Sequence, residues 1–394
     1  MDFTLNEEQQ AYRDAAQAFA NKELAPNAAH WDGEAIFPVD IIKKAGELGF
    51  CGIYSPIESG GLGLSRLDAH LIFEALSHGC TSTAAYITIH NMATWMITSF
   101  GNQQLIDQWG QDLTSGNKLA SYCLTEPNAG SDAASLKTTA RLDDSGDHYI
   151  INGSKCFISG AGSTDVLVMM ARTGDTSKPE QSGAKGISCF LIPANAEGIS
   201  YGRKEEKMGW NCQPTRMISF EDVKVPVGNR IGNEGEGFKF AMKGLDGGRI
   251  NIASCSLGTA QAALEASQRY MNEREQFGKP IANFQALQFK LSTMATELVA
   301  ARQMVRLAAT KLDNGAPDAT LYCAMAKRFA TDAGFQICNE AMQIHGGYGY
   351  IREYPIERYM RDTRVHQILE GTNEVMNHIV ARQLLAIDDL EILK

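Results

Sequence analysis

The periodicity of apolar residues changes twice along this chain of 394 residues, and these two changes constrain the fold more than any single motif. Helical periodicity runs through residues 1–118, short runs typical of strands occupy residues 119–230, and helical periodicity returns in residues 231–394. We therefore predict an α+β chain of three domains with those boundaries.

The central region predicts a β domain. Its short apolar runs are separated by turn signals at residues 127–130 and 144–146, and by the pair Asn152-Gly153, which is a strong hairpin signal. No helical pattern intervenes between the runs, so the strands should form an antiparallel sandwich or barrel.

The last region predicts a helix bundle. Helical patterns at residues 236–245, 249–273, 286–314 and 318–343 are each long enough for it. The sequence Asp-Gly-Gly-Arg at residues 246–249 then lies at the head of the second helix. The long helices are rich in alanine, methionine and leucine, and we expect their apolar faces to pack against copies of the same chain.

The charge balance excludes some classes of partner. The chain has 36 basic and 46 acidic residues, a net charge of −10, and no basic run longer than Arg203-Lys204. We therefore expect no nucleic-acid partner and no anionic membrane surface. No apolar run approaches the roughly 18 residues that span a membrane.

Cysteine and histidine usage argues against disulfides and metals. The nine cysteines are scattered without a Cys-x-x-Cys pair, and the histidines lack metal-ligand spacing, so we expect reduced thiols and no metal site. The first residues resemble neither a signal peptide nor an arginine-rich transit peptide. The expected compartment is a bacterial cytoplasm, or the mitochondrial matrix if a presequence has been removed.

One glutamate in the last region has the surroundings of a catalytic base. Residues 367–378 read Gln-Ile-Leu-Glu-Gly-Thr-Asn-Glu-Val-Met-Asn-His, with two apolar residues before Glu370, Gly371 after it, and helical periodicity from Glu374 onward. We expect Glu370 on a turn before an amphipathic helix, where apolar neighbours could desolvate it enough to deprotonate a weak carbon acid. The alternative is a solvated glutamate whose charge suits a helix start.

Two strand ends carry groups suited to a planar ligand. The run Tyr122-Cys-Leu-Thr-Glu-Pro-Asn-Ala-Gly-Ser-Asp132 would present the hydroxyl groups of Thr125 and Ser131 beside exposed backbone amides. The run Phe157-Ile-Ser159 adds an aromatic face and another hydroxyl group, and glycines follow that allow close approach. Ordinary turns are the alternative for both runs.

Two glycine-bearing helix ends could hold a phosphate group. Arg274-Glu-Gln-Phe-Gly278 and Gln343-Ile-His-Gly-Gly-Tyr-Gly349 both offer backbone amides, and the first run adds an arginine for charge-assisted bonds. The second run follows a helical pattern and lacks the Gly-x-Gly-x-x-Gly spacing, so a Rossmann fold is a poor interpretation. We expect His345 to stabilise the turn rather than act as a ligand or base.

Six motifs follow one another in order: Tyr-Cys-Leu-Thr-Glu-Pro, Phe-Ile-Ser-Gly, Asp-Gly-Gly-Arg, Arg-Glu-Gln-Phe-Gly, Gln-Ile-His-Gly-Gly-Tyr-Gly and Leu-Glu-Gly-Thr-Asn-Glu. In this order they resemble the acyl-CoA dehydrogenase family over essentially the whole chain. The resemblance implies an N-terminal helical domain, a central antiparallel β domain and a C-terminal four-helix bundle. It also implies FAD as cofactor, an acyl-CoA substrate, an electron-transfer flavoprotein as electron acceptor, and a homotetramer built as two dimers.

The motif match implies roles for individual residues, with Glu370 as the catalytic base. The flavin would be held by Tyr122, Cys123, Leu124, Thr125, Gly130, Ser131, Phe157, Ile158 and Ser159. The FAD of a neighbouring subunit would be reached by Arg274, Phe284, Gln285, Gln343, His345, Gly346 and Gly347. The cofactor site would be completed by Thr372, Asn373 and Glu374. The acyl-CoA would contact Ser131, Asp246, Gly247, Gly248, Arg249 and Arg382.

A finer resemblance concerns the substrate. Residues 89–92, 211–216, 249–256 and 365–371 are similar to family members that act on isobutyryl-CoA. The implied reaction is dehydrogenation of isobutyryl-CoA to methacrylyl-CoA, a step of valine catabolism. The alternatives are a 2-methylbutyryl-CoA or short straight-chain acyl-CoA dehydrogenase, an acyl-CoA oxidase, and a non-catalytic flavin- or CoA-binding scaffold. Leu369 stands where straight-chain members commonly carry an aromatic residue, and we take it as a hypothesis for a pocket shaped for a branched acyl group.

Overall fold

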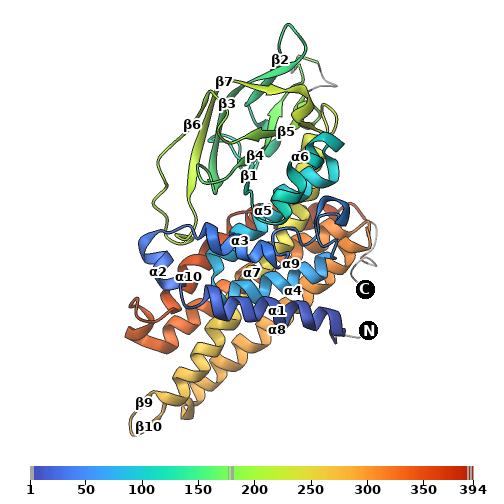
Figure 1. Ribbon diagram of the computed structural model, residues 1–394. Helices are drawn as coiled ribbons and strands as arrows, with labels where there is room; N and C mark the ends of the chain where they lie inside the picture. The colour runs from blue at the N-terminus through green and yellow to red at the C-terminus, as the bar shows by residue number, and fades with distance from the viewer. Residues whose placement is uncertain (1–3, 176, 179–181, 388–389, 391–392, 394) are drawn as a thin grey trace.

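The computed structural model describes residues 4–175, 177–178, 182–387, 390 and 393. An N-terminal helical segment comprises α1 (Glu7–Phe19), α2 (Ala28–Glu34), α3 (Val39–Glu47), α4 (Arg66–Gly79), α5 (Thr81–Phe100) and α6 (Gln103–Thr114). A C-terminal helical segment comprises α7 (Gly237–Glu273), α8 (Gln285–Asp313), α9 (Ala319–His345), α10 (Ile356–Arg364) and α11 (Asn373–Leu384). Figure 1 shows the sheet at one end of the molecule and helices of both segments at the other, where α4 packs against α7.

Along the chain, the stretch between the two helical segments forms one sheet of eight strands among the described residues: β1 (Ala120–Cys123), β2 (Thr139–Leu142), β3 (His148–Ser159), β4 (Val166–Arg172), β5 (Ile187–Pro193), β6 (Ile199–Tyr201), β7 (Thr215–Pro226) and β8 (Arg230–Ile231). The strand order is β6-β7-β3-β2-β4-β5-β8, with β1 paired to β4. Most pairs are antiparallel, but β1 and β2 both run parallel to β4. The parallel pairs arise because the chain reverses its direction twice before β4, once at the β2–β3 hairpin and again between β3 and β4.

Strands β1 and β2 lie one after the other along β4. β1 pairs with the first half of β4, whereas Thr139 of β2 pairs with Arg172 at its end. The chain between them, residues 124–138, therefore leaves the sheet as a loop between two strands that β4 holds in register. This loop carries Thr125 and Ser131, two of the predicted flavin-binding residues.

Burial on both faces explains the continuous apolar run of β4. Val166 and Val168 share a core with residues of α5 and α7, whereas Leu167 and Met169 share a second core with residues of β3 and β7. Successive side chains of a strand point to opposite faces, so β4 joins the helices to the rest of the sheet. Helices, a largely antiparallel sheet and a C-terminal helical region confirm the predicted fold class.

The hairpin predicted at Asn152-Gly153 is wrong. Both residues lie inside β3, which continues along β7 across a bulge between Ile151 and Gly153. The φ angle of Gly153 is 147°, so this glycine serves a bulge rather than a tight turn. The reversal between β2 and β3 occurs at the other predicted turn, around residues 144–146.

The helix start predicted at residues 246–249 is also wrong. The two helices expected before and after it form one continuous helix, α7, which passes through Gly247 and Gly248. A glycine inside a helix is destabilising by roughly 1 kcal/mol relative to alanine. Their neighbours in space, rather than a helix boundary, explain why these positions are glycine.

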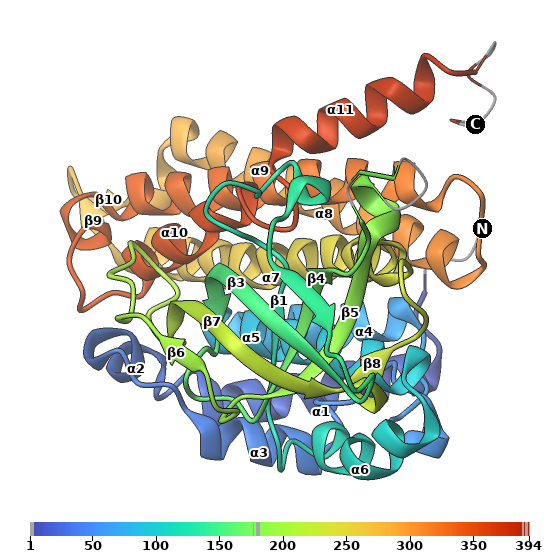
Figure 2. The ribbon, with the colours of Figure 1, turned by 90° about the horizontal axis from the view of Figure 1, so that it is seen from above.

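The C-terminal helices form the expected bundle. Helices α7, α8 and α9 share one core, to which Ile356 of α10 also belongs. A short hairpin of β9 (Glu275–Gln276) and β10 (Lys279–Pro280) connects α7 to α8. Figure 2 shows α11 lying above α9 and projecting from the rest of the helices.

Candidate active site

Glu370 lies in the turn that precedes α11, as predicted. Its φ angle is 54°, in the left-handed region, and Gly371 follows with a φ angle of 85°. Thr372 then caps α11, because its side chain accepts a hydrogen bond from the backbone N–H of Val375. A left-handed glutamate is strained, and such strain persists only where surrounding contacts hold it. The position of Glu370 therefore depends on its neighbours.

The carboxylate of Glu370 is shielded from solvent. Its Oε2 atom is buried and has no hydrogen-bond partner among the described residues, although the residue as a whole is partly exposed. Burial raises the pKa of Glu370 to about 7, and the nearby positive charges of Arg249 and Lys327 oppose this effect. A carboxylate with this pKa is a stronger base than a solvated one and still ionises near neutral pH.

Two glycines of α7 allow side chains from other elements to lie against the helix backbone. A Cβ atom at Gly248 would lie 2.5 Å from Oε2 of Glu370, and a Cβ atom at Gly247 would lie 2.4 Å from Nη1 of Arg66. The guanidinium group of Arg66 also stacks over the ring of Tyr54 at 3.5 Å. Gly247 and Gly248 therefore leave a strip of the α7 surface without side chains, which we call the bare strip, and the carboxylate of Glu370 lies against it.

The other half of that motif is a buried ion pair. Arg249 donates from Nη1 to Oδ1 of Asp246 over 2.6 Å, and Oδ2 of Asp246 accepts a hydrogen bond from Thr320 over 2.8 Å. Burial raises the pKa of Asp246, against the opposing charge of Arg249. Both oxygens of the Asp246 carboxylate thus accept hydrogen bonds from protein groups. Its partner Arg249 is the residue of this pair whose charge acts on Glu370.

The remaining predicted acyl-CoA contacts lie on other elements. Ser131 is exposed on the 124–138 loop, and Arg382 is exposed on α11. Arg382 is nine residues beyond Asn373, the first residue of that helix, which corresponds to about 14 Å along the helix axis. The structure therefore gathers Gly248 and Arg249 next to Glu370, but not Arg382.

A buried lysine that the sequence analysis missed holds the turn. Lys327 of α9 donates from Nζ to the carbonyl oxygen of Gly371 over 2.7 Å and to Oδ1 of Asn373 over 2.8 Å. The side chain of Asn373, predicted to bind cofactor, is therefore engaged inside the protein, whereas Glu374 is exposed. No local signal distinguishes Lys327 from the neighbouring Arg328, because only the fold decides which of the two is buried.

The first group of predicted flavin-binding residues meets at one edge of the sheet. The backbone N–H of Cys156 donates to the carbonyl oxygen of Thr125 over 2.9 Å, which brings the 124–138 loop beside the end of β3. Phe157 has a left-handed φ angle of 57°, and its side chain is 69% exposed. This edge thus presents an aromatic face next to the partly exposed Thr125 and Ser159.

Tyr122 links this edge to Glu370. Its hydroxyl group is buried and has no hydrogen-bond partner among the residues that the structure describes. Burial raises the pKa of Tyr122 well above its usual value, and the negative charge of Glu370 adds to the effect. Cys123, Leu124 and Ile158 are buried in the two cores around the sheet, so only their backbone groups remain for a ligand.

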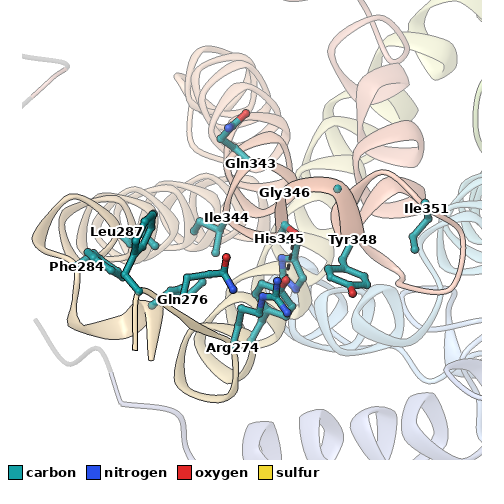
Figure 3. A pocket seen from close by; sticks show the side chains of 14 residues that line it. Arg274, Gln276, Phe284, Leu287, Gln343, Ile344, His345, Gly346, Tyr348 and Ile351 are labelled. Atoms are coloured by element: carbon teal, nitrogen blue, oxygen red, sulfur yellow. Dashed lines mark hydrogen bonds between the residues drawn. The ribbon is translucent and has the colours of Figure 1, made fainter. Parts of the chain in front are cut away.

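The second group lines a pocket of about 580 Å³ at the other end of the molecule, shown in Figure 3. Its lining includes Arg274, Phe284, Gln343, His345, Gly346 and Gly347, but not Gln285. His345 is buried, bonds through Nδ1 to the carbonyl oxygen of Ala341 at 2.8 Å and stacks on Tyr270 at 4.3 Å. This histidine stabilises the helix end, in agreement with the sequence-based expectation.

The two groups do not form one site within a single chain. None of the residues at the sheet edge lines the pocket of Arg274. Figure 2 shows the β9–β10 hairpin at the outer edge of the molecule, apart from β1. Each group nevertheless fits one part of a flavin dinucleotide: the exposed Phe157 and the unpaired Tyr122 suit a ring system, while an arginine beside open glycines suits phosphate groups.

Models of three domain families match successive parts of the chain. The acyl-CoA dehydrogenase N-terminal domain matches residues 6–117, the middle domain residues 121–223 and the C-terminal domain residues 235–385. This chain belongs to the acyl-CoA dehydrogenase family. Acyl-CoA dehydrogenases are FAD-dependent oxidoreductases, so FAD is the cofactor that the two groups described above would hold.

Relatives of this acyl-CoA dehydrogenase are similar over nearly its whole length. The mitochondrial isobutyryl-CoA dehydrogenase of Bos taurus is 54% identical over 381 residues, covering 97% of this chain and 90% of that protein. The corresponding protein of Dictyostelium discoideum is 51% identical over 380 residues, covering 96% and 90%. The structure of butyryl-CoA dehydrogenase from Megasphaera elsdenii superposes with a TM-score of 0.93 at 40% identity, covering 98% of this chain and 100% of that one.

Within the described ranges, no cluster of three or more histidine, cysteine, aspartate or glutamate side chains could hold a metal ion. In the same part of the chain, no helix has the length and apolar character needed to cross a membrane.

Proposed function

We propose that this acyl-CoA dehydrogenase converts isobutyryl-CoA to methacrylyl-CoA in valine catabolism, with Glu370 as the base that removes the α-proton. The observation that carries the proposal is the buried, unpaired Oε2 atom of Glu370 against Gly248 of α7. The choice of isobutyryl-CoA is supported by two relatives of that name at 54% and 51% identity.

The surroundings of Glu370 match the demands of α-proton removal. The proton next to a thioester is weakly acidic, so the base must be desolvated and correctly placed. Burial supplies the first requirement, since it raises the pKa of Glu370 to about 7. The turn and the bare strip of α7 supply the second. FAD, when bound, supplies the acceptor for the hydride that leaves the β-carbon.

We assign the cofactor contacts to two chains. The sheet edge around Tyr122, Thr125 and Phe157 would hold the flavin ring system of its own chain. The pocket around Arg274 and Gln343 would hold the nucleotide part of the FAD bound by a neighbouring subunit. This division supports the pairing of subunits within the proposed homotetramer of two dimers, because neither group completes a site alone.

The proposed partners and compartment follow the family resemblance. Electrons would pass from the reduced enzyme to an electron-transfer flavoprotein. The compartment would be the mitochondrial matrix or a bacterial cytoplasm, and the names of both relatives include the word mitochondrial.

Anaerobic visible absorption of the FAD-saturated protein tests the reaction. We expect isobutyryl-CoA to bleach the oxidised flavin band rapidly and to yield methacrylyl-CoA, faster than butyryl-CoA or 2-methylbutyryl-CoA does. Bleaching only with another acyl-CoA would retain the enzyme class and reject the substrate. Flavin that stays oxidised with every member of the panel would reject the proposal.

Glu370→Gln tests the base. This variant should retain FAD, because the carboxylate has no hydrogen-bond partner to lose among the described residues. Its rate of flavin reduction should fall by roughly 10³-fold, the scale of a lost general base. A variant that reduces FAD at the wild-type rate would remove Glu370 from this role.

A further inference from the structure

Two successive basic residues of α9 face opposite environments. The side chain of Arg328 is 46% exposed and pairs with Asp332 over 3.6 Å. The side chain of Lys327 is fully buried, and among the described residues it donates hydrogen bonds to Gly371 and Asn373, which follow Glu370 in the chain. A buried ammonium group is unfavourable unless its contacts compensate for lost solvation. The contacts of this buried ammonium group therefore point to a role for Lys327 at the turn.

We propose that Lys327 is a positioning residue for the catalytic base. Its ammonium group fixes the strained turn through the first carbonyl group after Glu370, and it places a positive charge near the carboxylate. This inference rests on the proposed role of Glu370 as the base.

The first part of the argument is geometric. The left-handed angles of Glu370 and Gly371 need contacts that exclude other conformations of the turn. Lys327 binds the carbonyl oxygen of Gly371 and the side chain of Asn373, the first residue of α11. Without these bonds, the turn could relax and withdraw the carboxylate from α7.

Other side chains of α9 bind residues on both sides of the turn. Oδ1 of Asp332 accepts a hydrogen bond from Gln367 before the turn and from Asn373 after it, each over 2.7 Å. Thr331 also accepts from Asn373 over 3.0 Å. Lys327 is the member of this network that reaches the backbone next to Glu370.

The second part of the argument is electrostatic. Charged and titratable groups face the carboxylate and the ammonium group from several elements: Arg249 from α7, Asp332 from α9, Glu374 from α11, Tyr122 from β1, Tyr54, and His366 from the segment before the turn. The positive charges of Arg249 and of Lys327 itself hold the pKa of Glu370 below the value that burial alone would give. Removal of the positive charge of Lys327 should therefore raise the pKa of Glu370.

The test compares four variants of the FAD-loaded enzyme. Lys327→Met removes the charge and both hydrogen bonds, Lys327→Gln removes the charge but keeps a donor, and Lys327→Arg keeps the charge. Arg328→Met is the matched control, because it removes one positive charge from the same helix and no side-chain hydrogen bond to the turn. Arg328 pairs with Oδ2 of Asp332, whereas Gln367 and Asn373 bind Oδ1. The readouts are FAD content, kcat and KM, the pH profile of kcat/KM, and hydrogen exchange of residues 368–373 without substrate.

For Lys327→Met we expect normal FAD content, kcat lowered roughly 10- to 100-fold with a smaller change in KM, and faster exchange at residues 368–373. Because the base acts ionised, the acid limb of its pH profile should move to higher pH by about one unit. Lys327→Gln should show the same shift with a smaller loss of kcat, and it replaces Lys327→Met as the test if the latter does not fold. Lys327→Arg should leave the acid limb of the pH profile unchanged, because it keeps the positive charge.

Lys327 has no positioning role if its neutral variants match Arg328→Met in kcat, pH profile and exchange. Lys327 would likewise be only a structural residue if its neutral variants lost thermal stability but kept the wild-type pH profile of kcat/KM. Failure of the proposed function gives a different result: wild-type flavin would stay oxidised with isobutyryl-CoA. In that case the exchange of residues 368–373 still decides whether Lys327 fixes the turn.

Discussion

A buried carboxyl group without a partner binds its proton more tightly in the folded protein than in the unfolded chain, and Glu370 is such a group. Its ionisation therefore opposes folding. The opposing effect is absent below the usual glutamate pKa of 4.5, grows as the pH rises, and is complete above the folded pKa of about 7. The raised pKa that suits Glu370 to its proposed role as base thus lowers the stability of the folded protein above neutral pH.

This conflict predicts a pH-dependent gain of stability in Glu370→Gln. The variant should melt at a higher temperature than the wild type at pH 8, and the difference should shrink at pH 5, where the wild-type residue is protonated. Thermal unfolding of both FAD-loaded proteins measures it. Glu374→Gln is the control, because hydrogen bonds lower the pKa of that exposed glutamate and its loss should not stabilise the protein. A gain for Glu370→Gln that is equal at both pH values would contradict the explanation.

Glu370 could be predicted because its signals are adjacent in sequence: two apolar residues, a glycine and a helix start. Lys327 could not, because its acceptors belong to a distant segment that reaches α9 only in the folded chain. Tyr122 lies between these cases, since the sequence places it in a ligand-binding run but does not show that its hydroxyl group lacks a partner.

At the level of elements, α7 shows how a local signal can be misread. A glycine pair before an arginine looks like a helix boundary, yet α7 continues through it. The two positions are glycine because side chains of other elements, Glu370 and Arg66, lie against the helix there. The pair Asn152-Gly153 is a similar case, because a bulge and a tight turn favour the same residues. Long apolar periodicity was more reliable, because the patterns at residues 286–314 and 318–343 correspond to α8 and α9.

The bare strip of α7 leads to a prediction for Gly248→Ala. The added Cβ atom would lie 2.5 Å from Oε2 of Glu370, so the carboxylate must move and flavin reduction by isobutyryl-CoA should slow about 100-fold. The matched control is Gly33→Ala in α2, where a Cβ atom meets nothing within 4 Å. That control should keep its activity and gain up to about 1 kcal/mol of stability. Equal activity of the two variants would show that Gly248 does not seat the base.

At the level of the whole molecule, the two groups of proposed FAD contacts lie on different parts of one chain. In a symmetric dimer, each complete site then combines the sheet edge of one subunit with the Arg274 pocket of the other. A subunit carrying Glu370→Gln and a subunit carrying Arg274→Gln would form one intact site and one doubly altered site.

Co-expression of these two variants should therefore restore activity that neither has alone. With random pairing, roughly a quarter of the sites should be intact, and flavin reduction by isobutyryl-CoA in the mixed preparation measures them. The control pairs Glu370→Gln with a chain carrying both substitutions, which leaves no intact site. A mixture no more active than the sum of its separate variants would reject the shared site.

The register of β1 and β2 along β4 has a consequence for how such enzymes diversify. Both ends of the 124–138 loop are anchored on one strand, so a change in its length need not propagate into the sheet. Loops on a rigid scaffold accept insertions and deletions more readily than the elements they connect. The length of the loop can thus change independently of the fold, at positions away from the proposed flavin contacts Thr125 and Ser131.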